Sequence, residues 1–233
     1  GAHNYAIGRK ALYNNTTGSF NMAIGRDALE ANQTGTQNIA IGYDCLTTAT
    51  AVDYGLAIGV NSQKNNQSGD SNVSVGWQSL KNTTTGSSNV AVGNEAMENN
   101  TTGQNCVAVG RTSLYQNTTG IHNTACGQSA LKSNTTASSN VAVGRTAMFA
   151  NTTGNNCVAV GTNALVAQTT GSHNTSIGHS NMGSVTTGSN NVAVGSFCLD
   201  IGTAMNYNVA MGHDTARHVT TGGNNVCLGH AAG

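Results

Sequence analysis

The apolar residues of this chain recur in a fixed short pattern. The pattern "apolar, small, apolar, Gly" occurs fourteen times, from residues 5–8 to residues 226–229, and each copy follows the previous one by 17 residues. Copies in phase, without insertion or deletion, are typical of architectures in which each unit buries its apolar side chains against its neighbours. The consensus is N-V-A-V-G-x-x-A-L-x-x-N-T-T-G-x-x, and positions are counted below from the glycine of the pattern, position 0.

Each repeat predicts one turn of a β-structure. The N-V-A-V segment is β-branched and alternates with a period of two, which favours a strand. The N-T-T-G segment has the residues of a turn, so we expect a strand, a turn, a short second strand around Ala-Leu, and a second turn. The sequence therefore predicts an all-β fold, a parallel β-solenoid (β-roll) of 14 coils of 17 residues that forms a single segment over residues 1–233.

The columns of equivalent positions predict which side chains face the core. Positions −1 and −3 are apolar in nearly every repeat, and position +4 is Leu or Met in eleven of the fourteen. Because residues at −1 and −3 lie on the same face of a strand, we expect them to form the core with position +4. The predicted structural core includes Ile24, Val92, Val109, Val143, Val160, Leu80 and Leu131.

The other face of the predicted strand is also restricted. Position −2 is Ala in eleven repeats and position −4 is Asn in eleven. An exclusively small column indicates close packing, and an Asn column can form a hydrogen-bonded ladder. We expect this face to pack against other copies of the chain in a symmetric homo-oligomer, most simply a trimer. The residues predicted for this oligomer face include Ala91, Ala108, Ala142, Asn89 and Asn140.

Charge and composition limit the classes of partner. Nine basic residues balance nine acidic ones, so the chain lacks the positive charge of a nucleic-acid-binding protein. No stretch approaches the 18 or so apolar residues of a membrane span. Gly1 and Gly233 both lie within a repeat, which leaves uncapped strand edges, so we expect the segment to continue within a longer fibre.

These motifs resemble a known group of fibre proteins. The runs N-V-A-V-G and N-M-A-I-G, followed by A-L and N-T-T-G, resemble the N-T-A-I-G-x-x-A-L-x-x-N-T-T-G repeats of phage tail-fibre-like and bacterial surface-fibre proteins. They are more distantly similar to the S-V-A-I-G head repeats of YadA-like trimeric autotransporter adhesins. The resemblance extends from Gly8 to Gly229. It implies a left-handed, trimeric β-roll that serves as a stiff shaft or adhesive head outside the cell or on a virion.

Residues with reactive side chains have simple interpretations here. Six cysteines replace Ala, Val or Asn of the consensus, and we expect buried free thiols rather than disulfides. Asp27 and Asp44 share position +2, and we interpret them as a salt-bridged surface column rather than a glycosidase pair. His179, His213 and His230 share position +1. We interpret them as an exposed ladder rather than a metal pair, because we expect no carboxylate in the same coil, and we predict no metal or cofactor.

The N-T-T-G turn suggests two further roles. Asn-x-Ser/Thr sequons recur at position +7, where glycosylation would cover the solenoid with one glycan per coil. The candidate sites are Asn15, Asn32, Asn66, Asn100, Asn117, Asn134 and Asn151. The repeated Thr pair could also form a Thr ladder of the kind that β-solenoid ice-binding proteins present, although consecutive side chains diverge in an extended segment.

We therefore predict a structural protein rather than an enzyme. The expected function is that of an extracellular, cell-surface or virion fibre, such as a tail fibre, whose rigid and multivalent display supports adhesion. The expected partners are further copies of the chain, possible end-to-end neighbours in a filament, and a surface glycan or receptor. Ice binding through the Thr ladder is the alternative function.

Overall fold

The computed structural model describes residues 1–233, and every regular element in it is a β-strand. The chain forms two compact units, Gly1–Thr119 and Gly120–Gly233. The strands of the first unit are β1 (Tyr5–Ile7), β2 (Met22–Ile24), β3 (Ile39–Ile41), β4 (Leu56–Ile58), β5 (Val73–Val75), β6 (Val90–Val92) and β7 (Val107–Val109). Those of the second are β8 (Thr124–Cys126), β9 (Val141–Val143), β10 (Val158–Val160), β11 (Thr175–Ile177), β12 (Val192–Val194), β13 (Val209–Met211) and β14 (Val226–Leu228). No helix of the chain is long and apolar enough to cross a membrane.

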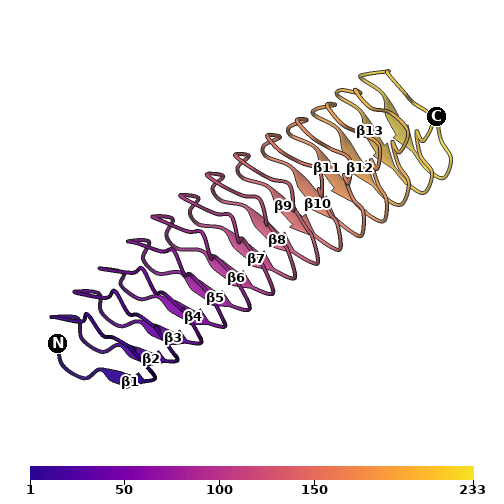
Figure 1. The fold of residues 1–233 in the computed structure, drawn as a ribbon. Helices are drawn as coiled ribbons and strands as arrows, with labels where there is room; N and C mark the ends of the chain where they lie inside the picture. Colours follow the sequence, from indigo (N-terminus) through magenta and orange to yellow (C-terminus); the bar gives the residue numbers. More distant parts are fainter. The chain divides into compact units, whose positions relative to one another are not determined.

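Each unit is a parallel β-solenoid, as the sequence predicts. Strands β1 to β7 pair in chain order in the first unit, and β8 to β14 do so in the second. Paired strand residues are 17 positions apart in the chain, as in Val90↔Val107 and Val141↔Val158. Figure 1 shows the resulting coils of each unit, each coil with one short strand. The 17-residue period is thus the length of one coil.

The prediction of a second strand around Ala-Leu is wrong. That segment is a turn in which the residues at +2 and +4 adopt left-handed backbone conformations, for example Gln78 with φ of 56° and Leu80 with φ of 50°. Two left-handed residues so close together bend the chain sharply, which lets it close a coil within 17 residues. The turn is still hydrogen-bonded to the corresponding turn of the next coil, because the amide of Leu80 donates to the carbonyl of Ala96 at 3.0 Å.

The side of each strand that points into the solenoid is the opposite of the predicted one. Ala91, at position −2, and Leu80, at position +4, are completely buried. The prediction that Ile24, Val92, Val109, Val143 and Val160 form the core is therefore wrong. Val92, Val109 and Val143 are each 37% exposed, and Ile24 and Val160 are half-buried. The prediction for Leu80 and Leu131 is correct, since both are 0% exposed.

The physical reason for this orientation is the size of the coil. A turn of 17 residues leaves room for about one large side chain per coil, and the Leu or Met at +4 occupies it. The strand residue that faces this side chain must therefore be small. The columns predicted for the oligomer face line the interior of the chain instead: Ala91, Ala108, Ala142, Asn89 and Asn140 are all 0% exposed.

The predicted Asn ladder exists, but it lies inside the solenoid. The amide N–H of Asn140 donates to Oδ1 of Asn123 in the preceding coil at 3.0 Å, and Cys157 N–H donates to Oδ1 of Asn140 at 2.9 Å. Nδ2 of Asn140 donates to the carbonyl of Gly154 at 2.8 Å. The side chain thus satisfies buried backbone groups at a position that no strand pairing reaches.

The glycine at position 0 is fixed by its neighbour in the next coil. Gly93 has a φ of 140°, a conformation that other residues rarely adopt. A Cβ atom placed on it would lie 2.6 Å from the carbonyl oxygen of Gly110. Stacking on the next coil therefore excludes a side chain at Gly93. At Gly229 a Cβ atom would meet nothing within 4 Å, and its φ of 109° alone favours glycine.

Candidate interaction surface

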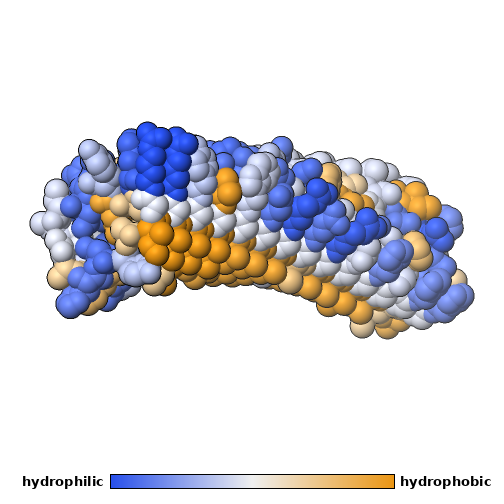
Figure 2. Space-filling view, turned by 60° about the horizontal axis from the view of Figure 1, so that its bottom comes forward, coloured by the Kyte–Doolittle hydropathy of each residue, from blue (hydrophilic) through white to orange (hydrophobic).

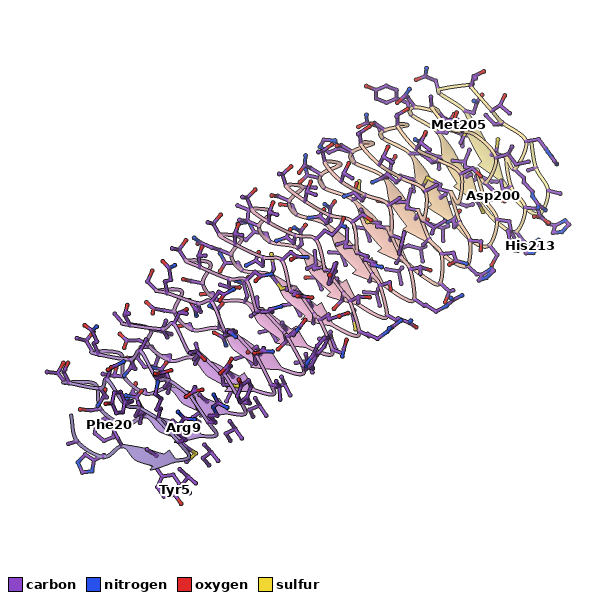
Figure 3. All side chains as sticks on the ribbon, viewed as in Figure 1. Tyr5, Arg9, Phe20, Asp200, Met205 and His213 are labelled. Carbon is purple, nitrogen blue, oxygen red and sulfur yellow. The ribbon has the colours of Figure 1, made fainter.

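The strand face of each unit consists of the side chains at positions −1 and −3 of its strands. Positions −1 and −3 point outward, and many of their side chains are exposed, among them Ile39, Val107 and Ile177 at 37–40%. Figure 2 shows the orange apolar side chains of the strands at the molecular surface, and Figure 3 shows Tyr5 projecting away from β1. Two apolar columns thus run across the coils of each unit on the solvent side.

This face contains no charged residue. Of its 28 positions, only Thr124 and Thr175 are polar, and Cys126 is the single thiol. Sheet faces that stay in water are typically interspersed with charged side chains, which prevent association. The uncharged strand face is therefore a candidate contact surface, whereas the face that the sequence predicted for oligomer contacts lies inside the solenoid.

Several charged residues lie on other columns and form ion pairs with each other. Lys64 Nζ lies 2.7 Å from Asp44 Oδ2, and Arg26 Nε lies 3.0 Å from Asp27 Oδ2. These ion pairs agree with the interpretation of Asp27 and Asp44 as a salt-bridged column. Lys10 pairs with Glu30 at 2.7 Å instead of with Asp27, and this contact raises the pKa of the lysine. Neither unit contains a pocket that could hold a small ligand.

The asparagine side chains of the sequons form hydrogen bonds that hold the turns of the folded chain. Nδ2 of Asn151 donates to Oδ1 of Asn134 at 3.1 Å and to the carbonyl of Gly154 at 3.0 Å. A glycan attached to that nitrogen would occupy the interior of the coil. The prediction of glycosylation therefore conflicts with the fold for the six candidates that are 0% exposed: Asn32, Asn66, Asn100, Asn117, Asn134 and Asn151. Asn15 is only half-buried, and its Nδ2 donates to the carbonyl of Gly18 at 3.0 Å.

All six cysteines are free, as predicted, but they differ in exposure. Cys45, Cys106, Cys157 and Cys198 are buried, and Cys227 is half-buried. Burial raises the pKa of the Cys45 thiol to about 12. Cys126 is exposed, so the expectation of a buried thiol is wrong there, because position −1 points outward.

The two threonines of each turn have different environments. The first donates its hydroxyl to the next coil, as Thr152 Oγ1 does to the carbonyl of Thr169 at 3.0 Å. The second is exposed, as in Thr153 and Thr170. The divergence expected for consecutive side chains is therefore observed, and a single threonine column remains accessible.

The histidines of position +1 are exposed, but they are accompanied by a carboxylate. The rings of His213 and His230 stack at a centroid distance of 5.6 Å. Asp214 Oδ2 lies 3.1 Å from His213 Nδ1, so the expectation that no carboxylate shares the coil is wrong. The sequence contained the signal, since Asp214 directly follows His213.

Comparison of the chain with protein-family models, curated proteins and solved structures finds no match.

Proposed function

We propose that this chain is a structural segment of an extracellular or virion fibre that assembles with further copies of itself through the strand face. The supporting observation is the uncharged, apolar and solvent-facing pair of columns at positions −1 and −3. The three-chain stoichiometry rests on the resemblance of the repeats to trimeric surface fibres. In this assembly the exposed columns of the turns remain accessible and display their side chains in many copies for adhesion to a surface glycan or receptor.

The size of the strand face supports a second copy as its partner. Seven strands spaced about 4.8 Å apart, each three residues wide, give a projected area of about 340 Å² per unit. Each chain has two such faces. One face alone is smaller than the roughly 800 Å² per partner of a standard protein interface, so a stable assembly would use both faces of each chain. An apolar face that repeats with a constant spacing is also complementary to itself, which a symmetric homo-oligomer requires.

The test is the mass and shape of the full chain in solution, measured by light scattering coupled to small-angle X-ray scattering. We expect an oligomer, with three chains as the expected number. The variant Val109→Lys should reduce it to the monomer, because a charge would have to be buried in the contact.

The matched control is Thr102→Lys, which places the same charge on an exposed turn. We expect this variant to keep the wild-type mass, and circular dichroism should show that both variants are folded. A monomeric wild-type chain, or an oligomer unaffected by Val109→Lys, would contradict assembly through the strand face.

Ice binding is the second candidate function. It is favoured by the exposed threonine column, which includes Thr136, Thr153, Thr170 and Thr187 at a constant spacing in the second unit. The measurement is thermal hysteresis of a monomeric sample. Hysteresis that disappears in Thr153→Asn would support ice binding, whereas its absence in the wild type would exclude it.

A further inference from the structure

Three side chains with metal-binding atoms converge on the last two coils of the second unit. His213 follows β13 and His230 follows β14, both at position +1, and Asp214 neighbours His213. One ligand atom from each of the three residues lies within 4.8 Å of the others. The imidazole rings are nearly parallel, with an interplanar angle of 7°. His213 projects from the surface in Figure 3.

The backbone ladder fixes the spacing of the two histidines. Gly229 N–H donates to the carbonyl of Met211 at 2.8 Å, and Ala231 N–H donates to the carbonyl of His213 at 2.9 Å. These hydrogen bonds flank the histidine pair on both sides. The main chains of His213 and His230 therefore stay at the strand spacing, and only side-chain rotation is needed to bring the rings to a common point.

We propose that His213, His230 and Asp214 bind a divalent transition-metal ion, with zinc as the reference ion. Imidazole and carboxylate are the ligands of open zinc sites, in which three protein groups and water complete the coordination. Ligand bonds of about 2.0–2.2 Å place neighbouring tetrahedral ligands roughly 3.3–3.5 Å apart. His213 Nδ1 and Asp214 Oδ2 already lie 3.1 Å apart. His213 then carries its proton on Nε2, and His230 rotates to supply the third ligand.

The surrounding charges leave the required carboxylate oxygen available. Arg217 Nη1 lies 3.0 Å from Asp214 Oδ1, which leaves Oδ2 directed toward His213. Arg217 Nε also lies 4.0 Å from Asp200 Oδ2, so a second carboxylate partly compensates the guanidinium charge. The ring of Phe197 contacts the imidazole of His213 edge-on, with 6.1 Å between the ring centroids. This contact limits rotation of the imidazole on the side away from His230.

A bound ion would connect the coil of β14 to the coil of β13 through side chains as well as through the backbone. A metal ion that binds the folded chain but not the unfolded chain raises the free energy of unfolding. At concentrations well above the dissociation constant, this increase grows with the logarithm of the metal concentration divided by that constant. The site therefore provides a readout in thermal stability that is separate from the oligomeric state. The proposal is independent of the proposed fibre function.

The test is titration of the full chain with zinc chloride by calorimetry and with cobalt(II) by absorption spectroscopy. We expect one ion per chain, a raised Tm, and a cobalt spectrum without thiolate charge-transfer bands. His230→Asn should weaken binding about tenfold or more, and Asp214→Asn should weaken it as well. The matched control is His179→Asn, because His179 occupies the same column two coils away and should leave the affinity unchanged.

Two outcomes would overturn the proposal. One is the absence of saturable binding to a chain that circular dichroism shows to be folded. The other is binding that survives His230→Asn but is lost in Cys227→Ala or Cys126→Ser, which would assign the ion to thiols.

Discussion

Two adjacent residues, Ala91 and Val92, show how strictly this fold assigns each side chain to one side. Ala91 is completely buried against the interior, and Val92 is 37% exposed on the strand face. Because strand side chains alternate, both positions are fixed once the glycine column is in register. The small residue is buried and the larger one faces solvent, the reverse of the usual pattern in a globular core.

Substitutions at these two residues should differ in how much they destabilise the chain. Ala91→Leu inserts three carbon atoms into a filled interior, and we expect it to lower the free energy of unfolding by about 1–3 kcal/mol or more. In the monomeric chain, at low protein concentration, Val92→Asp should cost no more than about 1 kcal/mol, because it changes only the β-propensity of an exposed position. Urea denaturation followed by circular dichroism measures both. Tolerance of Ala91→Leu together with unfolding of Val92→Asp would contradict the observed orientation.

Thiol reactivity tests the same orientation without a destabilising substitution. In the native chain at low concentration, Cys126 should react first with a thiol reagent, because it is exposed. Cys45 should not react until the chain unfolds, because it is buried and its pKa is raised to about 12, so it stays protonated at neutral pH. Mass spectrometry of labelled peptides identifies the reacting residue. Cys126→Ser is the control that should remove the first label.

At the scale of the coil, the interior tolerates polar residues only as connected sets. Gln63 stands where most coils have Leu, and its Nε2 donates to Ser74 Oγ at 2.9 Å and to the carbonyl of Leu56 at 2.9 Å. Ser74 in turn lies 2.5 Å from Ser62 Oγ. All three side chains are 0% exposed. A buried group of this kind is stable only when its members are satisfied together.

Substitutions in the set of Gln63, Ser62 and Ser74 should therefore have non-additive effects on stability. Gln63→Leu alone removes the amide that Ser74 requires, and we expect a loss of about 1–3 kcal/mol. Adding Ser62→Ala and Ser74→Ala restores the apolar consensus, so the triple variant should be at least as stable as the wild type. Urea denaturation of the single, double and triple variants measures the coupling. Additive effects would show that the three residues act independently.

The buried polar set of Gln63, Ser62 and Ser74 also shows which features of the coil could be predicted from the sequence and which could not. The period, the parallel pairing and the glycine column follow directly from fourteen copies in phase. The inner face does not follow from hydrophobicity, because Ala and Asn are inside and Val is outside. The usable signal was the joint occurrence of exceptions: Ser74 at −2 accompanies Gln63 and Ser62, and Ser176 at −2 accompanies Asn181 at +3. Residues that change character together share an environment.

At the scale of the whole molecule, the proposed assembly through the strand face predicts that stability depends on concentration. If copies associate through this face, the folded state gains free energy from assembly and Tm rises with protein concentration. Cys126 lies within the strand face and serves as an internal probe. Its labelling rate should fall as the concentration rises, while that of Cys227 should not. An unchanged rate for Cys126 across the assembly range would contradict burial of this face.

The one-coil register has a consequence for how such a gene can change. Residue Val90 pairs with Val107, 17 positions later, and the same offset holds for every strand pair in both units. Deleting residues 87–103 should therefore join two matching coils and leave a folded chain with nearly the wild-type Tm. Deleting residues 87–102 displaces the following strands by one residue and turns inner side chains outward, so the Tm should fall sharply. If both predictions hold, recombination between the repeated DNA segments can lengthen or shorten this chain by whole coils without loss of folding, whereas changes of other lengths would disrupt it.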